Sequence, residues 1–283
     1  MPSKPLIDKV ALIGVGFIGG SIGLALRKQQ LAERVIGIDP NRHNLQIARK
    51  RKAITSGTSD LQRGIQHVSL AVISAPVQEI PQLIAQVAEA TGGDCLITDT
   101  GSVKEQIVAQ VKRGTRYIGS HPMAGSEQQG PRAAHADLLE DRMVILTPSG
   151  KIASDDLKQL EQFWGGLGAH TVQMSPLKHD RIVASVSHMP HLAAAGLVAA
   201  TPRQDILHVA SGWLDTTRIA SSDADLWVDI LCNNRDHVLK SAQRFGKVWA
   251  LLCEALQQND RKALKKILRD ANAQRKLAEK ARK

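Results

Sequence analysis

Short apolar runs alternate with amphipathic segments through the first 175 residues of the chain. The runs that predict buried strands are residues 10–13, 35–38, 68–74, 95–99, 117–119 and 143–146. The segments between them that have helical periodicity are residues 21–28, 45–51, 80–90 and 104–111. Such alternation is typical of parallel strands joined by crossover helices. The sequence therefore predicts an α/β fold with a doubly wound parallel sheet.

The pattern changes after Gln173, where strand-like runs stop and long helical patterns begin. Ser175 and Pro176 form a typical N-cap and first-turn pair, so a helix is expected to start there. It continues as an alanine-rich apolar segment that Pro190 is expected to kink or split. We predict one domain of residues 1–174 and an all-α domain of residues 175–283, whose apolar helices pack on a partner subunit as well as on each other.

The composition is that of a folded, intracellular protein. Apolar residues make up 43% and charged residues 23% of the chain, against globular averages of about 45% and 25%. The odd number of cysteines (Cys95, Cys232 and Cys253), without a CxxC spacing, argues against a disulfide framework or a thiol metal site. The N-terminal segment lacks the features of a signal peptide. We expect a cytoplasmic protein that does not act at a membrane.

The net charge of +10 suggests nucleic-acid binding at first, but it is concentrated at the C-terminus. Residues 260–283 contain ten Lys or Arg and three Asp or Glu. In the same segment Leu264, Ile267, Leu268 and Ala271 have helical spacing, which predicts a terminal amphipathic helix with a solvated basic face. The segment has no aromatic residue on which a base could stack. Nucleic acid is therefore not an expected partner.

A glycine-rich turn follows the first predicted strand and leads into the first predicted helix. It has the GxGxxG pattern, with Gly14, Gly16 and Gly19. In this context Gly14 permits the tight turn, Gly16 lets the backbone approach a pyrophosphate, and Gly19 allows the helix to pack closely on the strand. The helix N-terminus then faces the phosphates. Residues 1–174 are therefore predicted to bind a dinucleotide.

The end of the second predicted strand favours NAD as that dinucleotide. Asp39 lies twenty residues beyond Gly19, where a carboxylate accepts hydrogen bonds from the adenosine ribose. Arg42 is placed to meet the 2′-phosphate of NADP instead, so NADP remains an alternative. The predicted cofactor-binding residues also include Phe17 and Ile18, inside the glycine motif. At the end of the predicted strand 68–74 they include Ser74, Ala75 and Pro76.

A second group of polar residues follows the later strands. Ser102 lies in the segment DTGSVK and His121 in the segment SHPMAGSE, each near a predicted strand end. In open α/β sheets the ligand crevice lies beyond the carboxyl ends of the strands, so these two side chains are expected to converge near the nicotinamide. A histidine there can accept a hydroxyl proton. A single loop histidine is, however, more often structural than catalytic.

The motifs together resemble those of the prephenate and arogenate dehydrogenases of tyrosine biosynthesis. The segments that carry the resemblance are GVGFIGGS, DTGSVK, SHPMAGSE, SHMPH and DTTRIASSDADLW, in their usual order. The resemblance implies a Rossmann-type domain followed by a helical dimerisation and substrate-binding domain. It also implies oxidative decarboxylation of a cyclohexadienyl ring, with NAD accepting a hydride and carbon dioxide leaving. A homodimer acting on prephenate, arogenate or both is expected.

The resemblance also implies roles for individual residues. His121 matches the histidine that deprotonates the ring hydroxyl, and Ser102 the serine hydrogen-bonded to that group. Arg218 matches an arginine that binds the substrate carboxylate. The remaining residues matched to substrate binding or to the shape of the pocket are His191, His188, Ser126, Glu127, Asp215 and Trp227. The spacing of His188 and His191 suggests a metal pair, but no third ligand is recognisable, so no metal is expected.

Several alternatives stay open at this point. Gln128 occupies a position where many relatives are expected to have lysine, which puts any ionic contact there in doubt. No C-terminal regulatory domain is expected, so inhibition by tyrosine would act at the active site or the dimer. Another Rossmann-plus-helical dehydrogenase, acting on a β-hydroxy acid, would be expected to use a lysine in the helical domain. A dinucleotide-sensing or nucleic-acid-binding protein that uses the basic tail is the remaining alternative.

Overall fold

The computed structural model describes residues 5–125, 128–150 and 152–280. The chain divides into two compact units, Met1–Arg235 and Asp236–Lys283. The larger unit holds all the strands and the first helices, and the smaller unit is helical. The predicted domain boundary near residue 174 falls inside the larger unit, between the strand that ends at Gln173 and the helix that begins at Pro176, and it stays a prediction.

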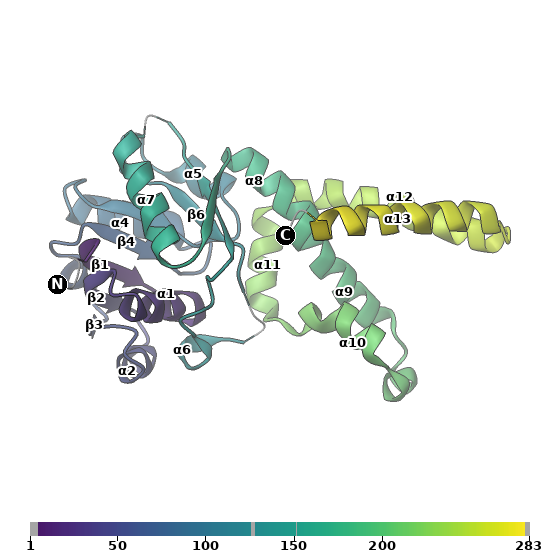
Figure 1. The fold of residues 1–283 in the computed structure, drawn as a ribbon, viewed down its shortest axis with the longest axis horizontal. Coiled ribbons are helices and arrows are strands. Elements are labelled where there is room, and N and C mark those ends of the chain that lie inside the picture. The colour runs from purple at the N-terminus through teal and green to yellow at the C-terminus, as the bar shows by residue number, and fades with distance from the viewer. Residues whose placement is uncertain (1–4, 126–127, 151, 281–283) are drawn as a thin grey trace. The chain divides into compact units, whose positions relative to one another are not determined.

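The larger unit is built on a five-stranded parallel sheet with the order β3-β2-β1-β4-β5 (Figure 1). The strands are β1 (Ile7–Ile13), β2 (Ala32–Ile38), β3 (Ser56–Thr58), β4 (Leu70–Ile73) and β5 (Leu96–Asp99). Ile13 is level with Ile38 on one side and Ile73 on the other, and Ile73 is level with Asp99. The carboxyl ends of four strands therefore form one edge. The strand order reverses beside β1, which is where open α/β sheets bind their ligands.

Helices cover both faces of this sheet, as expected when consecutive β1 residues point to opposite sides. Val10 and Leu12 pack with buried residues of α1, α2 and α7, whereas Ala11 and Ile13 pack with buried residues of α4 and α5. The helices are α1 (Phe17–Lys28), α2 (Arg42–Lys50), α3 (Leu61–Gly64), α4 (Ile80–Ala90), α5 (Glu105–Gln110), α6 (Gly130–Ala133) and α7 (Ser154–Gly166). The predicted doubly wound α/β architecture is confirmed.

A second, three-stranded sheet differs in detail from the prediction of parallel strands throughout. It contains β6 (Gly119–Pro122), β7 (Met143–Thr147) and β8 (His170–Gln173), in that order. β6 pairs antiparallel with β7, and β7 pairs parallel with β8. A bridge between Ile97 and Tyr117 links the β6 side of this sheet to β5. The bridge between Ile97 and Tyr117 is parallel, so the change of direction occurs at β7. An apolar run indicates that a strand is buried but carries no information on its direction, so this change could not be predicted.

Among the described residues, the larger unit continues with the α-helices α8 (Pro176–Val183), α9 (Met189–Ala200), α10 (Ser211–Thr217) and α11 (Ala224–Asn233), and with short 3-10 helices at Arg203–His208 and Arg218–Ser221. Ser175 caps α8 by accepting a hydrogen bond from the Lys178 backbone, as predicted. A π-helical turn, Ala184–His188, joins α8 to α9 and places Pro190 in the first turn of α9. The segment Pro176–Ala200 therefore stays helical throughout, with the interruption taken up by the π-helical turn before Pro190.

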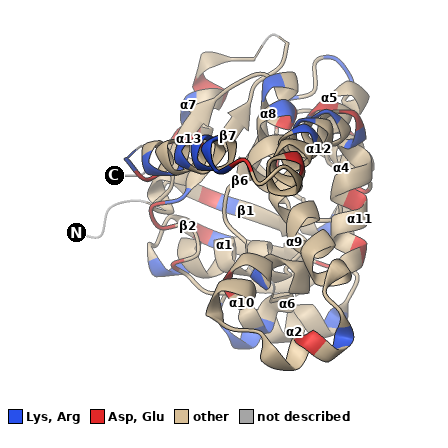
Figure 2. Cartoon of the chain, turned by 90° about the vertical axis from the view of Figure 1, so that its right-hand side faces the viewer, with Lys and Arg blue, Asp and Glu red and all other residues tan. Residues whose placement is uncertain are grey.

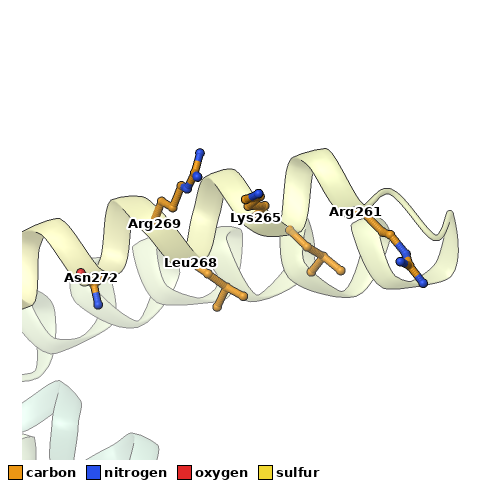
Figure 3. Close-up of a pocket in the computed structure, with 6 residues that line it drawn as sticks. Arg261, Lys265, Leu268, Arg269 and Asn272 are labelled. Atoms are coloured by element: carbon orange, nitrogen blue, oxygen red, sulfur yellow. The ribbon is translucent and has the colours of Figure 1, made fainter.

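The smaller unit consists mainly of two helices, α12 (Arg235–Gln257) and α13 (Arg261–Lys280). The predicted basic terminal helix is present, and Figure 2 shows its many Lys and Arg residues in blue. A hollow on α13 is lined by Arg261, Leu264, Lys265, Leu268, Arg269 and Asn272, most of which are labelled in Figure 3. Because every lining residue comes from one helix, the hollow follows the surface of that helix.

Candidate functional site

The glycine turn lies at the reversal point of the parallel sheet, between β1 and α1. Gly14 has φ +88°, and a Cβ there would collide with the carbonyl oxygen of Ser74. A Cβ on Gly19 would collide with the carbonyl oxygen of Gly14. Ser74 itself donates its backbone N–H to Ile13 at 2.7 Å. The turn and the residues after β4 are thus held together so closely that only glycine fits at positions 14 and 19.

Gly16 differs from its two neighbours in the motif, because a Cβ there would meet no atom within 4 Å. It is the N-cap of α1 and provides no side-chain cap. The first N–H groups of a helix lack intrahelical partners and carry partial positive charge. With Phe17 and Ile18 as its first residues, α1 therefore presents backbone donors beside open space. This cradle fits a pyrophosphate.

Asp39 follows β2 at the same edge and is only 6% exposed. Its Oδ2 accepts the backbone N–H of Val15 at 3.0 Å, and its Oδ1 accepts that of Asn41 at 2.8 Å. These bonds attach the carboxylate to the glycine turn and leave acceptor capacity for a ribose hydroxyl. Arg42 is the exposed first residue of α2. The residues present therefore fit the adenosine end of NAD.

We expect Gly16→Ala to weaken NAD binding by about tenfold, or roughly 1.4 kcal/mol, without destabilising the fold. The new methyl group meets no protein atom within 4 Å, but it occupies the space through which a pyrophosphate approaches α1. Titration of NAD and a urea unfolding curve measure the two effects. Gly165→Ala, on α7, is the matched control, because its Cβ also meets nothing within 4 Å. An unchanged NAD affinity in Gly16→Ala would place the pyrophosphate elsewhere.

His121 lies on β6 and is 7% exposed. Its Nδ1 lies 2.7 Å from Nε2 of His179, and Nδ1 of His179 lies 2.6 Å from Oδ1 of Asp180. His179 and Asp180, both on α8, are buried. Burial, with smaller effects from His179, Lys104 and His188, holds the pKa of His121 well below its ordinary value of 6.5. His121 is therefore a neutral imidazole at neutral pH, a form that can accept a proton.

A buried ion pair lies beside this histidine. Nζ of Lys104 contacts Oδ2 of Asp99, and neither side chain is exposed. The Asp99 carboxylate also accepts the hydroxyl of Tyr117 at 2.7 Å and the backbone N–H groups of Gly101 at 2.9 Å and Ser120 at 3.3 Å. The bonds from Tyr117 and Ser120 hold the end of β5 against β6 and the residue that leads into it, whereas the bond from Gly101 fixes the loop after β5. Asp99 and Lys104 thus fix the position of the strand that carries His121.

Ser102 lies in that loop and is half-buried. Among the described residues, no hydrogen bond joins it to His121. Ser120, the residue before His121, has its hydroxyl hydrogen-bonded inside the core. Its Oγ lies 2.7 Å from Oγ1 of Thr98 and accepts the Nε1–H of Trp164 at 3.1 Å. The structure therefore places Ser102 at the expected strand end, while its role with the substrate stays a prediction.

Two further predicted histidines lie on the helix that begins at Pro176. His188 is buried, and its Nδ1 lies 3.1 Å from Nδ2 of Asn234. Burial lowers the pKa of His188 to about 4. His191 stacks on Trp227 with 3.5 Å between ring centroids and an interplanar angle of 12°. The Nδ1 atom of His191 is buried and has no hydrogen-bond partner, which leaves one polar atom available for a ligand.

Arg218 lies on the short helix Arg218–Ser221, which packs on α9. It lines a hollow together with Val198, Trp213, Leu214, Asp215, Thr217, Ala220 and Ser221. The predicted pair Asp215 and Arg218 therefore shares one hollow, whose remaining lining is largely apolar. None of His121, His188 and His191 lines it. Ser126 and Glu127 lie outside the described residues, so their predicted contacts with the substrate stay predictions.

Several residues of the site were not predicted. His179 and Asp180 sit on α8 without a motif, and their only sequence signal is an adjacent His-Asp pair at the start of a helix. Asn234 donates to the backbone oxygen of Asp180 at 2.9 Å. Asp229 accepts the backbone N–H of Val77 at 3.1 Å, which connects α11 to the loop after β4. All four are distant in sequence from the residues they contact, which is why no local motif marks them.

One helix, Pro176–Ala200, is long and apolar enough to cross a membrane, with a mean hydropathy of 1.4. It is the one such helix within residues 5–125, 128–150 and 152–280. Length and composition are weak evidence, because a packed helix meets the same test. This helix carries buried polar side chains that bond to the α/β elements, among them His179 and Asp180. Within those same ranges, no group of three or more His, Cys, Asp or Glu side chains could hold a metal ion.

Comparison with known proteins gives matches along most of the chain. Residues 22–173 match the family described as prephenate dehydrogenase, nucleotide-binding domain, and residues 175–270 match prephenate dehydrogenase, dimerization domain. The prephenate dehydrogenase of Bacillus subtilis is 37% identical over 82% of this chain and 66% of its own length. That of Lactococcus lactis is 31% identical over 96% of this chain and 78% of its own. The chain thus spans about two thirds or more of the length of these relatives.

A solved structure gives the same result. The prephenate dehydrogenase of Aquifex aeolicus, in complex with hydroxyphenyl propionate and NAD+, superposes with a TM-score of 0.89 at 30% sequence identity. The superposition covers 96% of this chain and 98% of that one. It includes both the Rossmann-type sheet and the helical part, so the predicted succession of an α/β domain and a helical domain is confirmed.

Proposed function

Because this chain belongs to the prephenate dehydrogenase family, we propose that it converts prephenate to 4-hydroxyphenylpyruvate by NAD-dependent oxidative decarboxylation, a step of tyrosine biosynthesis. The observation that carries the proposal is His121, a buried neutral base on β6, next to the edge of the sheet that holds the dinucleotide cradle. Arogenate, which differs in its side chain, is the alternative substrate. The chain acts as a cytoplasmic homodimer in this proposal, in agreement with the match to a dimerization domain.

The cofactor-binding residues proposed are Gly14, Gly16, Phe17, Ile18, Gly19, Asp39, Arg42, Ser74, Ala75 and Pro76. When bound, NAD supplies a two-electron acceptor for the ring carbon that bears the hydroxyl. The backbone of Gly16 and the start of α1 hold the pyrophosphate, and Asp39 binds the ribose. Because the Asp39 carboxylate is fixed by Val15 and Asn41, a 2′-phosphate would bring a second negative charge beside it.

His121 handles the proton in the proposed mechanism. Its Nε2 accepts the proton of the ring hydroxyl as that oxygen becomes a carbonyl. The bond between the ring and the carboxylate then breaks, carbon dioxide leaves, and the electron pair enters the ring. The resulting phenolate oxygen takes the proton back from His121, which restores the neutral base. No proton is gained or lost overall, and aromatisation of the ring drives the reaction.

Binding of the substrate is assigned to Arg218, His191, His188, Ser126 and Glu127, with Ser102 beside the ring hydroxyl. Arg218 has the planar, permanently charged group that suits a carboxylate. The unpartnered Nδ1 of His191, stacked on Trp227, supplies a second polar contact. The ligand of the Aquifex protein, hydroxyphenyl propionate, pairs a phenol with a carboxylate, and this chemistry supports a site with one base and one cation.

An assay of four substrate pairs tests the proposal: prephenate or arogenate with NAD or NADP, followed by absorbance of the reduced cofactor. We expect turnover with prephenate and NAD, and a kcat/KM at least about tenfold lower with NADP. A preference for NADP would shift the ribose contact from Asp39 to Arg42. Turnover of arogenate alone would replace the substrate proposed. Absence of turnover in all four pairs, with NAD binding intact, would contradict the function.

A further inference from the structure

We propose that His179 and Asp180 form a relay that fixes His121 in the tautomer whose Nε2 is free to accept a proton. Both are then positioning residues, since they act through His121. The inference rests on the proposed function only for the use made of His121. The relay itself rests on two short contacts, His121 Nδ1 to His179 Nε2 at 2.7 Å and His179 Nδ1 to Asp180 Oδ1 at 2.6 Å.

The direction of the hydrogen bonds follows from the carboxylate. Asp180 accepts two backbone N–H groups, from Lys104 to Oδ1 at 2.8 Å and from Glu105 to Oδ2 at 2.9 Å, so it is an ionised acceptor. Nδ1 of His179 must then carry a hydrogen and donate it. In a neutral ring, Nε2 of His179 is left as an acceptor, so Nδ1 of His121 donates to it. Nε2 of His121 consequently has the free lone pair.

The surroundings hold this arrangement in one place. His179, Asp180 and Asn234 are all buried, and Asn234 donates to the backbone oxygen of Asp180 at 2.9 Å. The two N–H groups that Asp180 accepts belong to the start of α5, which links α8 to the loop after β5. The relay therefore connects His121 on β6 to two other elements, α8 and α5.

The charged and titratable groups that face His121 oppose one another. Burial disfavours a positive charge on the His121 ring most, followed by His179, Lys104 and His188. Burial also lowers the pKa of the neighbouring His179, against the opposite effect of Asp180 and Asp99. In the free enzyme the ring stays neutral. Once His121 has taken the substrate proton, the carboxylate of Asp180 stabilises the imidazolium through His179, as the buried aspartate does in a Ser-His-Asp triad.

The test has a spectroscopic arm that does not depend on turnover. Full-length protein labelled with 15N-histidine is examined by NMR, and the His121 signals are assigned by their loss in His121→Asn. We expect a protonated Nδ1 and an unprotonated Nε2 on His121 in the parent. In His179→Leu, which removes the acceptor, His121 should shift toward the Nε2–H form. A protonated Nε2 in the parent, or no shift in His179→Leu, would overturn the relay.

The kinetic arm uses two variants and one control. His179→Gln keeps an acceptor oxygen but breaks the link to the carboxylate, so kcat should fall by roughly 10- to 100-fold with an unchanged Kd for NAD. Asp180→Asn should lower kcat more, by roughly 10²- to 10³-fold, and move the acid limb of the kcat/KM profile to lower pH because a negative charge is lost. A loss of folded protein would reduce activity without moving that limb.

Arg181→Gln is the control, since this exposed residue follows Asp180 on α8 and its loss changes the charge of the same turn. It should keep kcat and the pH profile of the parent. Equal kinetics for the parent, His179→Gln and Asp180→Asn would overturn the relay. A parent without dehydrogenase activity would contradict the proposed function instead, and the NMR arm would still decide the tautomer.

Discussion

His121→Asn is expected to lower kcat by roughly 10²- to 10⁴-fold, the range typical for loss of a general base. Asparagine is close to histidine in size and can keep a hydrogen bond to Nε2 of His179, so strand β6 should remain in place. It cannot accept a proton at neutral pH. The Kd of NAD should stay unchanged, because no predicted cofactor-binding residue lies on β6. Steady-state kinetics and an NAD titration measure these two effects.

The pH dependence of the parent gives the same prediction a second readout. Since the pKa of His121 is held well below 6.5 by burial first and by His179, Lys104 and His188 next, the ring is neutral at and above that pH. Activity should therefore be constant near neutrality and should fall only at lower pH, as protonation through the lowered pKa removes the base. In His121→Asn this acid limb should be absent.

Arg218→Gln provides the contrast, because it is assigned to binding and not to proton transfer. It should raise KM for prephenate, with a much smaller change in kcat than His121→Asn causes. A His121→Asn variant with the kcat of the parent would show that another group takes the proton. A Kd for NAD that rises together with the loss of kcat would show that the substitution disturbs the whole site.

Lys104→Met is expected to destabilise the larger unit by about 3–5 kcal/mol, as measured by urea unfolding. The substitution keeps an apolar side chain of similar length but leaves the fully buried carboxylate of Asp99 without its cation. The other partners of Asp99, among them the Tyr117 hydroxyl, donate hydrogen bonds without a full positive charge. Loss of one partner of a buried pair costs more than loss of an exposed pair, because water does not reach the remaining charge.

Two variants separate this effect from a general loss of lysine. The double variant Asp99→Asn with Lys104→Met removes both charges and should be less destabilised than Lys104→Met alone. Lys28→Met breaks the pair with Asp137, whose side chains are 50% and 57% exposed, and should leave the unfolding midpoint nearly unchanged. Equal unfolding midpoints for Lys104→Met and Lys28→Met would show that the buried pair does not stabilise the fold.

Much of the α/β part could be predicted from local pattern. The strands β1, β2, β4 and β5 were found within a few residues, because strands buried on both faces form continuous apolar runs. The elements that were missed are short, amphipathic or partly exposed, namely β3, α3, α6, α7 and β8. In these segments, neither the length of the apolar run nor the turn residues distinguish a strand or a helix from a loop.

The proposed cofactor-binding residues could be predicted from the sequence because they lie close together along the chain or follow strand ends. Gly14 and Gly19 are glycines because backbone atoms occupy the space of a Cβ, a constraint that leaves a visible motif. His121 could be proposed as a base, but nothing in its own segment distinguished it from a structural histidine. Burial and the partner at Nδ1 support the proposed role of His121 as a base.

The sequence by itself determined the α/β class followed by a helical part, the GxGxxG turn and the family, since these depend on local periodicity and on motifs of contiguous residues. Only the tertiary structure decided which groups act together. His121 and His179 are 58 residues apart in sequence, and Lys104 and Asp180 are 76 apart. The protonation state and tautomer of a buried histidine depend on the atoms around its ring. Packing of α8 against β6 and α5 supplies those atoms, and no single segment of the chain encodes them.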